Sequence, residues 1–151
     1  MKNLIKTIFA VAVLFVMAAC TEKIESNEYL DVTPNNIAGS WRLESSCGEA
    51  LTEGVYVYID FNRKERTFEM YQNNDSSSTR YITGRYYIYT DGNYGAVIRG
   101  DYDFGNGAWE HRYVVTDLTE ERMTWTALDD ENYVDVYVRC DIPEDILAAK
   151  Q

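Results

Sequence analysis

Aromatic side chains with one histidine among them form the most concentrated chemistry in this sequence. Trp109, His111 and Tyr113 alternate along one predicted strand, and Trp125 lies on the same face of the next predicted strand as Met123. Alternate residues of a strand share a face. If both faces point inward, they line an aromatic cavity with a few polar groups, which is the usual lining of a small-molecule site. The alternative is a filled core, because Trp and Tyr occupy large volumes without a ligand.

His111 is the only histidine of the chain. A histidine that acts as a general base needs a nucleophile, or the proton it removes, within hydrogen-bond reach. No nucleophile is paired with His111 nearby in the sequence. We therefore expect a structural histidine, and a protein that is not an enzyme.

Cys20 ends an N-terminal segment with the composition of a secretory signal peptide. Lys2 and Lys6 supply positive charge, residues 8–19 are apolar without a break, and small residues immediately precede the cysteine. A basic region, an apolar region and a small-residue processing site follow one another in this order in secretory signals. The apolar run is too short for a transmembrane helix, which needs about 20 residues. We expect residues 1–19 to be removed.

The run Val16-Met17-Ala18-Ala19-Cys20 also resembles a bacterial lipobox. This resemblance implies that the Cys20 thiol is acylated and that Cys20 becomes the first residue of a mature lipoprotein. A single acyl chain anchors a protein only marginally, but bacterial lipoproteins carry three, which implies a permanent tether. The expected location is the outer membrane, with the protein facing either the periplasm or the cell surface.

The net charge of the chain limits the partners that it can bind. It is −11 for the whole chain, and removal of residues 1–19 with their two lysines leaves −13. A chain this acidic does not bind nucleic acid through its overall field, because phosphate contacts need clustered Lys and Arg. Anionic head groups repel it as well. We therefore expect membrane attachment through the lipid anchor alone.

Residues 20–36 have the composition of a lipidated cysteine followed by an acidic, flexible linker. The segment is polar, lacks periodicity and contains Pro34. Its charged beginning at Glu22, Lys23 and Glu25 resembles the signals that some bacteria place after a lipidated cysteine to send lipoproteins to the cell surface.

Residues 37–151 show the period-two pattern of half-buried strands. Eight strands are predicted, at residues 41–47, 55–61, 68–70, 80–90, 94–102, 109–116, 122–128 and 133–140. Their short connections, such as the Asp91-Gly92 turn, favour pairing between sequence neighbours. We predict an all-β domain, an eight-stranded antiparallel up-and-down β-barrel. A short C-terminal helix should follow near Pro143 and dock on the barrel through Ile146 and Leu147.

Gly39-Ser40-Trp41 stands at the head of the first predicted strand and resembles the G-x-W signature of lipocalins. The closest likeness is to the lipocalin-like domains of bacterial outer-membrane lipoproteins. It extends over residues 37–142 and is also carried by Tyr58-Ile59-Asp60-Phe61, Gly84, Gly100-Asp101-Tyr102 and Ile142-Pro143. The resemblance implies that Trp41 closes one end of the barrel beneath a basic residue of the last strand, through a cation–π contact worth about 0.5–2 kcal/mol. Arg139 is the first candidate for that residue, and Arg122 is the second.

With Cys20 assigned to the lipid, Cys47 and Cys140 are the remaining thiols. Together with His111 they are too few for a structural zinc site, which needs four nitrogen or sulfur ligands. We expect no metal site and no cofactor.

Two arguments about a disulfide between Cys47 and Cys140 oppose each other. Both residues fall by parity on the apolar face of their strands, the first and last strands are neighbours in a closed barrel, and the compartment is oxidising. However, an antiparallel register places Cys140 near Ser40 and Trp41. Cys47 then lies about 20 Å further along the strand, whereas bridged Cα atoms lie within about 7 Å. We predict that the two cysteines do not pair.

Two functions remain open. The first is binding of a small apolar or aromatic molecule in the barrel mouth, with Trp109, His111, Tyr113 and Trp125 as candidate lining. The second is a non-catalytic interaction module that docks a protein or a polysaccharide in a cell-envelope complex. Tyrosines clustered on the outer face would favour docking, and a roomy interior around the tryptophans would favour a ligand. The five informative tyrosines are Tyr56, Tyr58, Tyr71, Tyr87 and Tyr89.

Overall fold

The computed structural model describes residues 28–150. The expected signal peptide, Cys20 and the first part of the linker lie outside the described residues. No helix within residues 28–150 is both long and apolar enough to cross a membrane.

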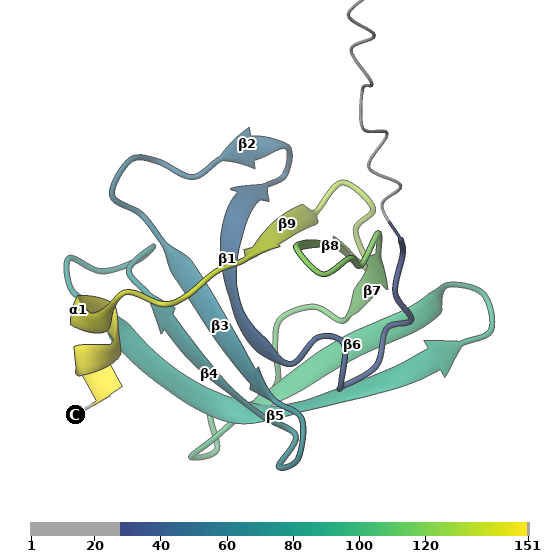
Figure 1. Cartoon of the computed structure of the whole chain (residues 1–151), viewed down its shortest axis with the longest axis horizontal. Helices are drawn as coiled ribbons and strands as arrows, with labels where there is room; N and C mark the ends of the chain where they lie inside the picture. The colour runs from purple at the N-terminus through teal and green to yellow at the C-terminus, as the bar shows by residue number, and fades with distance from the viewer. Residues whose placement is uncertain (1–27, 151) are drawn as a thin grey trace, which may run out of the picture.

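The described chain forms a closed antiparallel β-barrel (Figure 1). Each strand of the barrel pairs with its neighbour in the sequence, and the last strand returns to pair with the first. The strands are β1 (Gly39–Ser46), β2 (Glu49–Ala50), β3 (Val57–Asn62), β4 (Thr67–Gln72), β5 (Arg80–Asp91), β6 (Gly95–Tyr102), β7 (Tyr113–Thr116), β8 (Arg122–Ala127) and β9 (Val134–Arg139). The two-residue strand β2 only extends β1 by a hairpin. The predicted eight-stranded barrel is therefore confirmed, with one extra strand.

The alternation of side chains in each strand separates a core from an outer face. Inward-facing residues of all eight barrel strands, together with Ile37 and Leu118, form one continuous buried cluster. Gly84 in β5 is required for this packing, because a Cβ there would lie 2.6 Å from the ring of Phe68 and 2.2 Å from the carbonyl oxygen of Asp101. The long strand β5 can therefore pass close to β4 and β6 only with glycine at this position.

The sixth predicted strand, residues 109–116, is only half a strand in the structure. β7 begins at Tyr113 and pairs with β6 at two positions, and the preceding residues fold back on β6 as a small hairpin. The Tyr102 amide donates to the Gly107 carbonyl at 2.7 Å, and the Trp109 amide donates to the Gly100 carbonyl at 2.8 Å. This hairpin fills the space between β6 and β7 and directs Trp109 into the barrel.

The prediction that Cys140 lies on the apolar, inward face of the last strand is wrong. In β9 the buried side chains are Asp135 and Tyr137, whereas the valines between them are only half-buried. Cys140 consequently faces outward, where it packs against an outer cluster that contains Tyr58 and Tyr71. The predicted apolar face of the first strand also ends early, because the register shifts between Leu43 and Ser45 and Cys47 lies exposed in the turn to β2.

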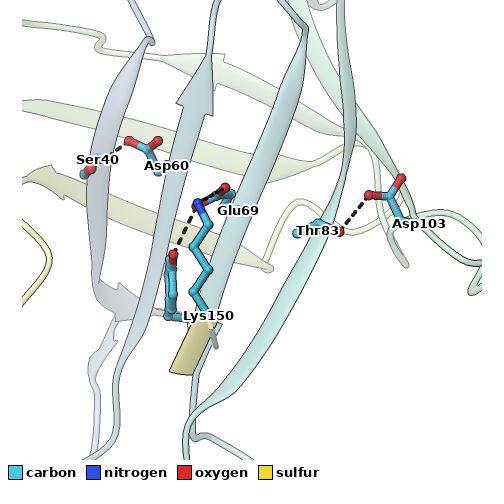
Figure 2. A network of polar contacts seen from close by, with 7 residues as sticks. Ser40, Asp60, Glu69, Thr83, Asp103 and Lys150 are labelled. Carbon is cyan, nitrogen blue, oxygen red and sulfur yellow. Dashed lines mark hydrogen bonds and ion pairs between the residues drawn. The ribbon is translucent and has the colours of Figure 1, made fainter. Parts of the chain in front are cut away.

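The C-terminal segment forms a helical turn, α1 (Glu144–Leu147), and a 3-10 turn, η1 (Ala148–Lys150). Figure 1 shows α1 outside the barrel. Ile146 is buried there against the outward-facing rings of Tyr58 and Tyr71. Lys150 donates to Glu69 of β4 at 2.6 Å (Figure 2), and the Tyr71 hydroxyl donates to the other oxygen of the same carboxylate at 3.0 Å. The predicted helix therefore docks through Ile146, while Leu147 is 40% exposed.

The end of the predicted linker packs on the barrel. Leu30 and Val32 lie against the core cluster, and the Leu30 amide donates to the Leu118 carbonyl at 2.8 Å. The packed part of the chain thus begins before residue 37.

Candidate ligand site at the barrel mouth

One end of the barrel is closed by Trp41 and Arg139. Their Cα atoms are partners in the β1–β9 ladder, and the Arg139 guanidinium lies 4.0 Å from the centroid of the Trp41 ring. The same guanidinium donates to the carbonyl oxygens of Glu120, Ala38 and Asn36 at 2.6, 2.7 and 2.9 Å. The Trp41 indole donates to the Ile37 carbonyl at 2.8 Å. Arg122, the second candidate, instead pairs with Glu44 on the outer face.

The interior above Trp41 is filled by aromatic rings in contact. Trp125 lies at the centre, with ring centroids 5.5 Å from Trp109, 5.2 Å from Tyr113 and 4.7 Å from Tyr137. Phe68 continues the stack at 5.1 Å from Trp109. The predicted cavity residues Trp109, Tyr113 and Trp125 are therefore brought together, and their neighbours are protein side chains.

The indole nitrogen of Trp109 is buried and has no hydrogen-bond partner within residues 28–150. Its ring lies flat on β6, since a Cβ on Gly100 would stand 2.2 Å from the ring atom Cε2. A buried donor without an acceptor costs about 1–3 kcal/mol. The Trp109 ring is therefore held by packing alone.

His111 lies at the rim, where its ring contacts those of Tyr113 and Tyr133, at 5.9 and 4.8 Å between ring centroids. Its Nδ1 is 2.9 Å from an oxygen of Asp129, and this hydrogen bond lowers the pKa of the Asp129 carboxyl below its usual value. A surface hollow of about 470 Å³ lies between Trp109, His111 and the β8–β9 turn. In the part of the chain that the structure describes, no group of three or more His, Cys, Asp or Glu side chains is placed to hold a metal ion.

A larger cavity of about 770 Å³ opens at the rim of the barrel, between the start of β5 and the turn that follows β6. It exists because β5 starts before its pairing with β6 begins: residues 80–83 pair with β4, and the β5–β6 ladder starts at Gly84 and Tyr102. Its apolar walls are Tyr81, Ile82, Tyr102 and Phe104, and its polar groups include Gln72, Arg80, Thr83, Asp103 and Asn106. We call it the mouth cavity.

Phe104 stands at the edge of the mouth cavity and is 94% exposed. It occupies a turn with φ of 60°, a conformation that a bulky side chain adopts rarely. The turn is held beside the cavity because the Thr83 hydroxyl donates to Asp103 at 2.6 Å, as Figure 2 shows.

Asp135 is the buried charged residue of the described chain, with 5% of its surface exposed. The Ser46 hydroxyl donates to its Oδ1 at 2.6 Å. Burial raises the pKa of this carboxyl above its ordinary value, while Ser46 and His111 oppose the shift. Burial also raises the pKa of Tyr113, with further contributions from Tyr133, Asp135 and Tyr102.

Sequence reasoning missed Asp135 and the mouth cavity. The three valines of β9 alternate with its other residues and suggest the opposite face. However, an inward Arg139 already requires Tyr137 and Asp135 to point inward as well. Phe104 stood within a Gly- and Asn-rich turn, where an aromatic side chain has no core to enter. That mismatch was the signal in the sequence for the mouth cavity.

The five informative tyrosines divide into two groups. Tyr56, Tyr58 and Tyr71 belong to the outer cluster around Ile146, where the C-terminal segment packs on them. Tyr87 and Tyr89 lie on the outer face of β5, and Tyr87 is 41% exposed beneath the Arg99 guanidinium at 4.4 Å.

Of the comparisons with known proteins, the family model agrees with the observed fold. A search of curated proteins finds no match. The family model described as a lipocalin-like domain matches residues 37–125, which is more than half of the chain and spans β1 to β8 up to Trp125. A lipocalin-like barrel fits small-molecule binding in general. The chain belongs to the family of lipocalin-like domains.

Proposed function

We propose that this barrel binds a small molecule with a flat apolar or aromatic part in the mouth cavity. The observation that carries the proposal is the cavity itself: about 770 Å³, walled by Tyr81, Ile82 and Tyr102, with Phe104 exposed at its edge. Small-molecule sites are typically about 300–1,000 Å³ and combine apolar walls with a few polar groups. The filled interior around Trp125 supports a site at the mouth rather than deep in the barrel.

The test uses 1-aminoanthracene, an apolar aromatic probe, with residues 28–151 and with the full mature chain. Binding should saturate and raise the melting temperature. It should also change the intrinsic tryptophan fluorescence, because Tyr102 in the cavity wall contacts Phe68, which in turn contacts Trp109. At a probe concentration about 100 times Kd, mass action stabilises the fold by about 2.7 kcal/mol.

Two variants locate the site. Phe104→Ala should weaken probe binding by about tenfold, because a ring that closes over a ligand contributes on the order of 1–2 kcal/mol. Tyr94→Ala is the matched control, since Tyr94 is also a strongly exposed aromatic residue but does not line the mouth cavity. Equal effects of the two substitutions, or a probe that causes neither response, would count against the site.

We also propose that Cys20 tethers the barrel to the outer membrane as a lipoprotein, facing the periplasm or the cell surface. The lipobox-like sequence supports this, and Cys20 lies outside the described residues. Cys20→Ala in the native host should move the protein from the membrane fraction to the soluble fraction, whereas Cys47→Ala should leave it in place. Retention of the Cys20→Ala protein after a high-salt wash would exclude the tether.

A second function, docking of a protein or polysaccharide in an envelope complex, is favoured by the outer face of β5. Tyr87 and Arg99 stack there in an exposed position. Under this alternative, Tyr87→Ala would abolish co-purification of a partner while probe binding in the mouth cavity stayed intact.

A further inference from the structure

The inner side of the mouth cavity carries a positive charge. Tyr86 of β5 belongs to the buried core, and alternate residues of a strand share a face. Arg80 has the same parity as Tyr86 and Gly84, so it belongs to the inner face of β5. Gln72 is the Cα partner of Arg80 in the β4–β5 ladder, and Tyr102 is the partner of Gly84 in the β5–β6 ladder. All three side chains, of Arg80, Gln72 and Tyr102, line the cavity.

The acidic residue that lines the mouth cavity, Asp103, lies on the opposite side. Its amide donates to the Thr83 carbonyl at 3.0 Å, and its carboxylate accepts the Thr83 hydroxyl, as Figure 2 shows. Thr83 has the opposite parity to Arg80, so this carboxylate is held at the outer face of β5. Arg80 is therefore the charged side chain on the inner side of the cavity.

Arg80 has a carboxylate partner, but that pair is weak and uses little of the guanidinium. Its Nη1 contacts Asp75 in the β4–β5 loop, and the two side chains are 50% and 52% exposed. An ion pair this exposed contributes about 0–1 kcal/mol. A guanidinium has five N–H donors in a fork that matches the two oxygens of a carboxylate, whereas Asp75 is bonded to one of its nitrogens. A ligand can therefore bind to Arg80 beside Asp75 or in its place.

Gln72 and Tyr102 add donors that suit the same ligand group. Burial and the charge of Glu110 raise the pKa of Tyr102, and Arg80 opposes the shift, so the hydroxyl remains a donor at neutral pH. The Gln72 amide is also a donor. A carboxylate can accept from all three side chains, whereas an ammonium group would be repelled by Arg80. A doubly charged group such as a phosphate would meet stronger repulsion from Asp103.

We propose that the ligand of the mouth cavity is an apolar or aromatic carboxylate, whose anionic group binds to Arg80 and accepts hydrogen bonds from Gln72 and Tyr102. Its flat part lies against the apolar wall formed by Ile82 and Phe104. This inference rests on the proposed function, since it names the chemistry of the molecule that enters the mouth cavity. The whole chain is acidic, so its overall field disfavours an anion, and a preference for one has to come from the site itself.

The experiment compares three naphthalene probes of similar size that differ in charge: 2-naphthoate (anion), 2-naphthamide (neutral) and 2-naphthylmethylammonium (cation). Isothermal titration calorimetry at pH 7 is carried out on the two proteins used for 1-aminoanthracene, and binding should weaken in that order. We expect 2-naphthoate to bind about ten times more tightly than 2-naphthamide, which corresponds to about 1.4 kcal/mol.

Two arginine variants separate the site from the general charge of the protein. Arg80→Gln removes the guanidinium and should abolish the preference for 2-naphthoate, while 2-naphthamide binds as before. Arg99→Gln is the matched control, because Arg99 forms a similarly exposed ion pair with Asp101 and does not line the mouth cavity. It changes the net charge by the same amount and should retain the preference. Both variants are checked for folding by their melting temperatures.

The aspartates of the same two ion pairs give a second test. Asp75→Asn releases Arg80 from its partner and should increase the preference for 2-naphthoate by about two- to fivefold, the range that corresponds to an exposed ion pair. Asp101→Asn removes the same charge outside the mouth cavity and should change the preference less.

Each outcome decides between the two proposals. If 2-naphthoate binds no more tightly than 2-naphthamide, or if only 1-aminoanthracene binds, the carboxylate inference is overturned and the mouth site stands. An unchanged preference in folded Arg80→Gln, or an equal loss in Arg99→Gln, has the same meaning. If Arg80→Gln does not fold, the aspartate variants decide, and equal effects of Asp75→Asn and Asp101→Asn would overturn the inference. Binding of none of these probes and no binding of 1-aminoanthracene would overturn both proposals.

Discussion

At the scale of single residues, Arg139 has the largest number of polar contacts of any side chain described above. It donates to three backbone carbonyls and stacks on Trp41. We expect Arg139→Ala to lower the free energy of unfolding by about 2–4 kcal/mol, because the stacking is lost and the carbonyls lose their donor. Arg139→Lys should lose less, since an ammonium keeps the cation–π contact. Urea denaturation of the three proteins measures both effects, and equal stability of Arg139→Ala and the unsubstituted chain would contradict this assignment.

The stability contribution of Asp135 should depend on pH with a defined sign. Burial raises the pKa of this carboxyl in the folded state. The folded state then binds a proton more readily than the unfolded state, so stability from this group falls as pH rises through the interval between the two pKa values. Asp135→Asn should therefore stabilise the protein at pH 7, and the gain should vanish at acid pH, where Asp135 is protonated. Melting temperatures between pH 3 and pH 8 test this; a variant that is less stable at pH 7 would contradict the expected sign.

At the scale of elements, the C-terminal segment is held by packing more than by charge. Ile146 is buried against Tyr58 and Tyr71, whereas the Lys150–Glu69 ion pair is half-exposed. Ile146→Ala should cost about 2–4 kcal/mol, and Lys150→Ala less than about 1 kcal/mol. Chemical denaturation compares the two variants. A larger loss for Lys150→Ala would mean that the ion pair, and not the apolar contact, attaches the segment.

Strand β6 depends on a glycine where the hairpin folds back. A Cβ on Gly100 would collide with the Trp109 ring at 2.2 Å. We expect Gly100→Ala to destabilise the protein by about 1–3 kcal/mol, the usual cost of overpacking, and to change the near-ultraviolet circular dichroism of the tryptophans. Gly92→Ala is the control: a methyl group on Gly92 would meet no atom within 4 Å, so its effect should stay within about 0.5 kcal/mol. Similar losses for both variants would argue against the packing of Trp109 on β6.

At the scale of the whole molecule, the β1–β9 register keeps the two cysteines apart. Trp41 pairs with Arg139 and the Cys140 amide donates to the Ser40 carbonyl, while the Cys47 amide donates to the Val134 carbonyl at the other end of β9. Both cysteines are free in the structure. Thiol titration of unfolded, non-reduced residues 28–151 should find two free thiols. A titration that finds none would require a different closure of the barrel.

The fold could be predicted from the sequence because its signals are local. Strand alternation, turn residues such as Asp91-Gly92 and the short connections depend on neighbours in the chain, and an up-and-down barrel pairs each strand with the next one. The stacking of Arg139 on Trp41 was expected from the Gly39-Ser40-Trp41 resemblance. The face of β9 was predicted wrongly because three valines have high β-propensity on either side of a sheet.

The candidate site depended on contacts between distant parts of the chain. Whether Trp109 and Trp125 line a cavity or fill the core is decided by how closely eight strands bring their rings together, and no spacing in the sequence encodes that distance. The mouth cavity arises because the first residues of β5 pair with β4 but not with β6. The burial of Asp135 arises from its position opposite Ser46 in β1 and Trp125 in β8. The sequence by itself determined that the chain makes a barrel, because alternation is local; the closure of that barrel decided which side chains are buried together.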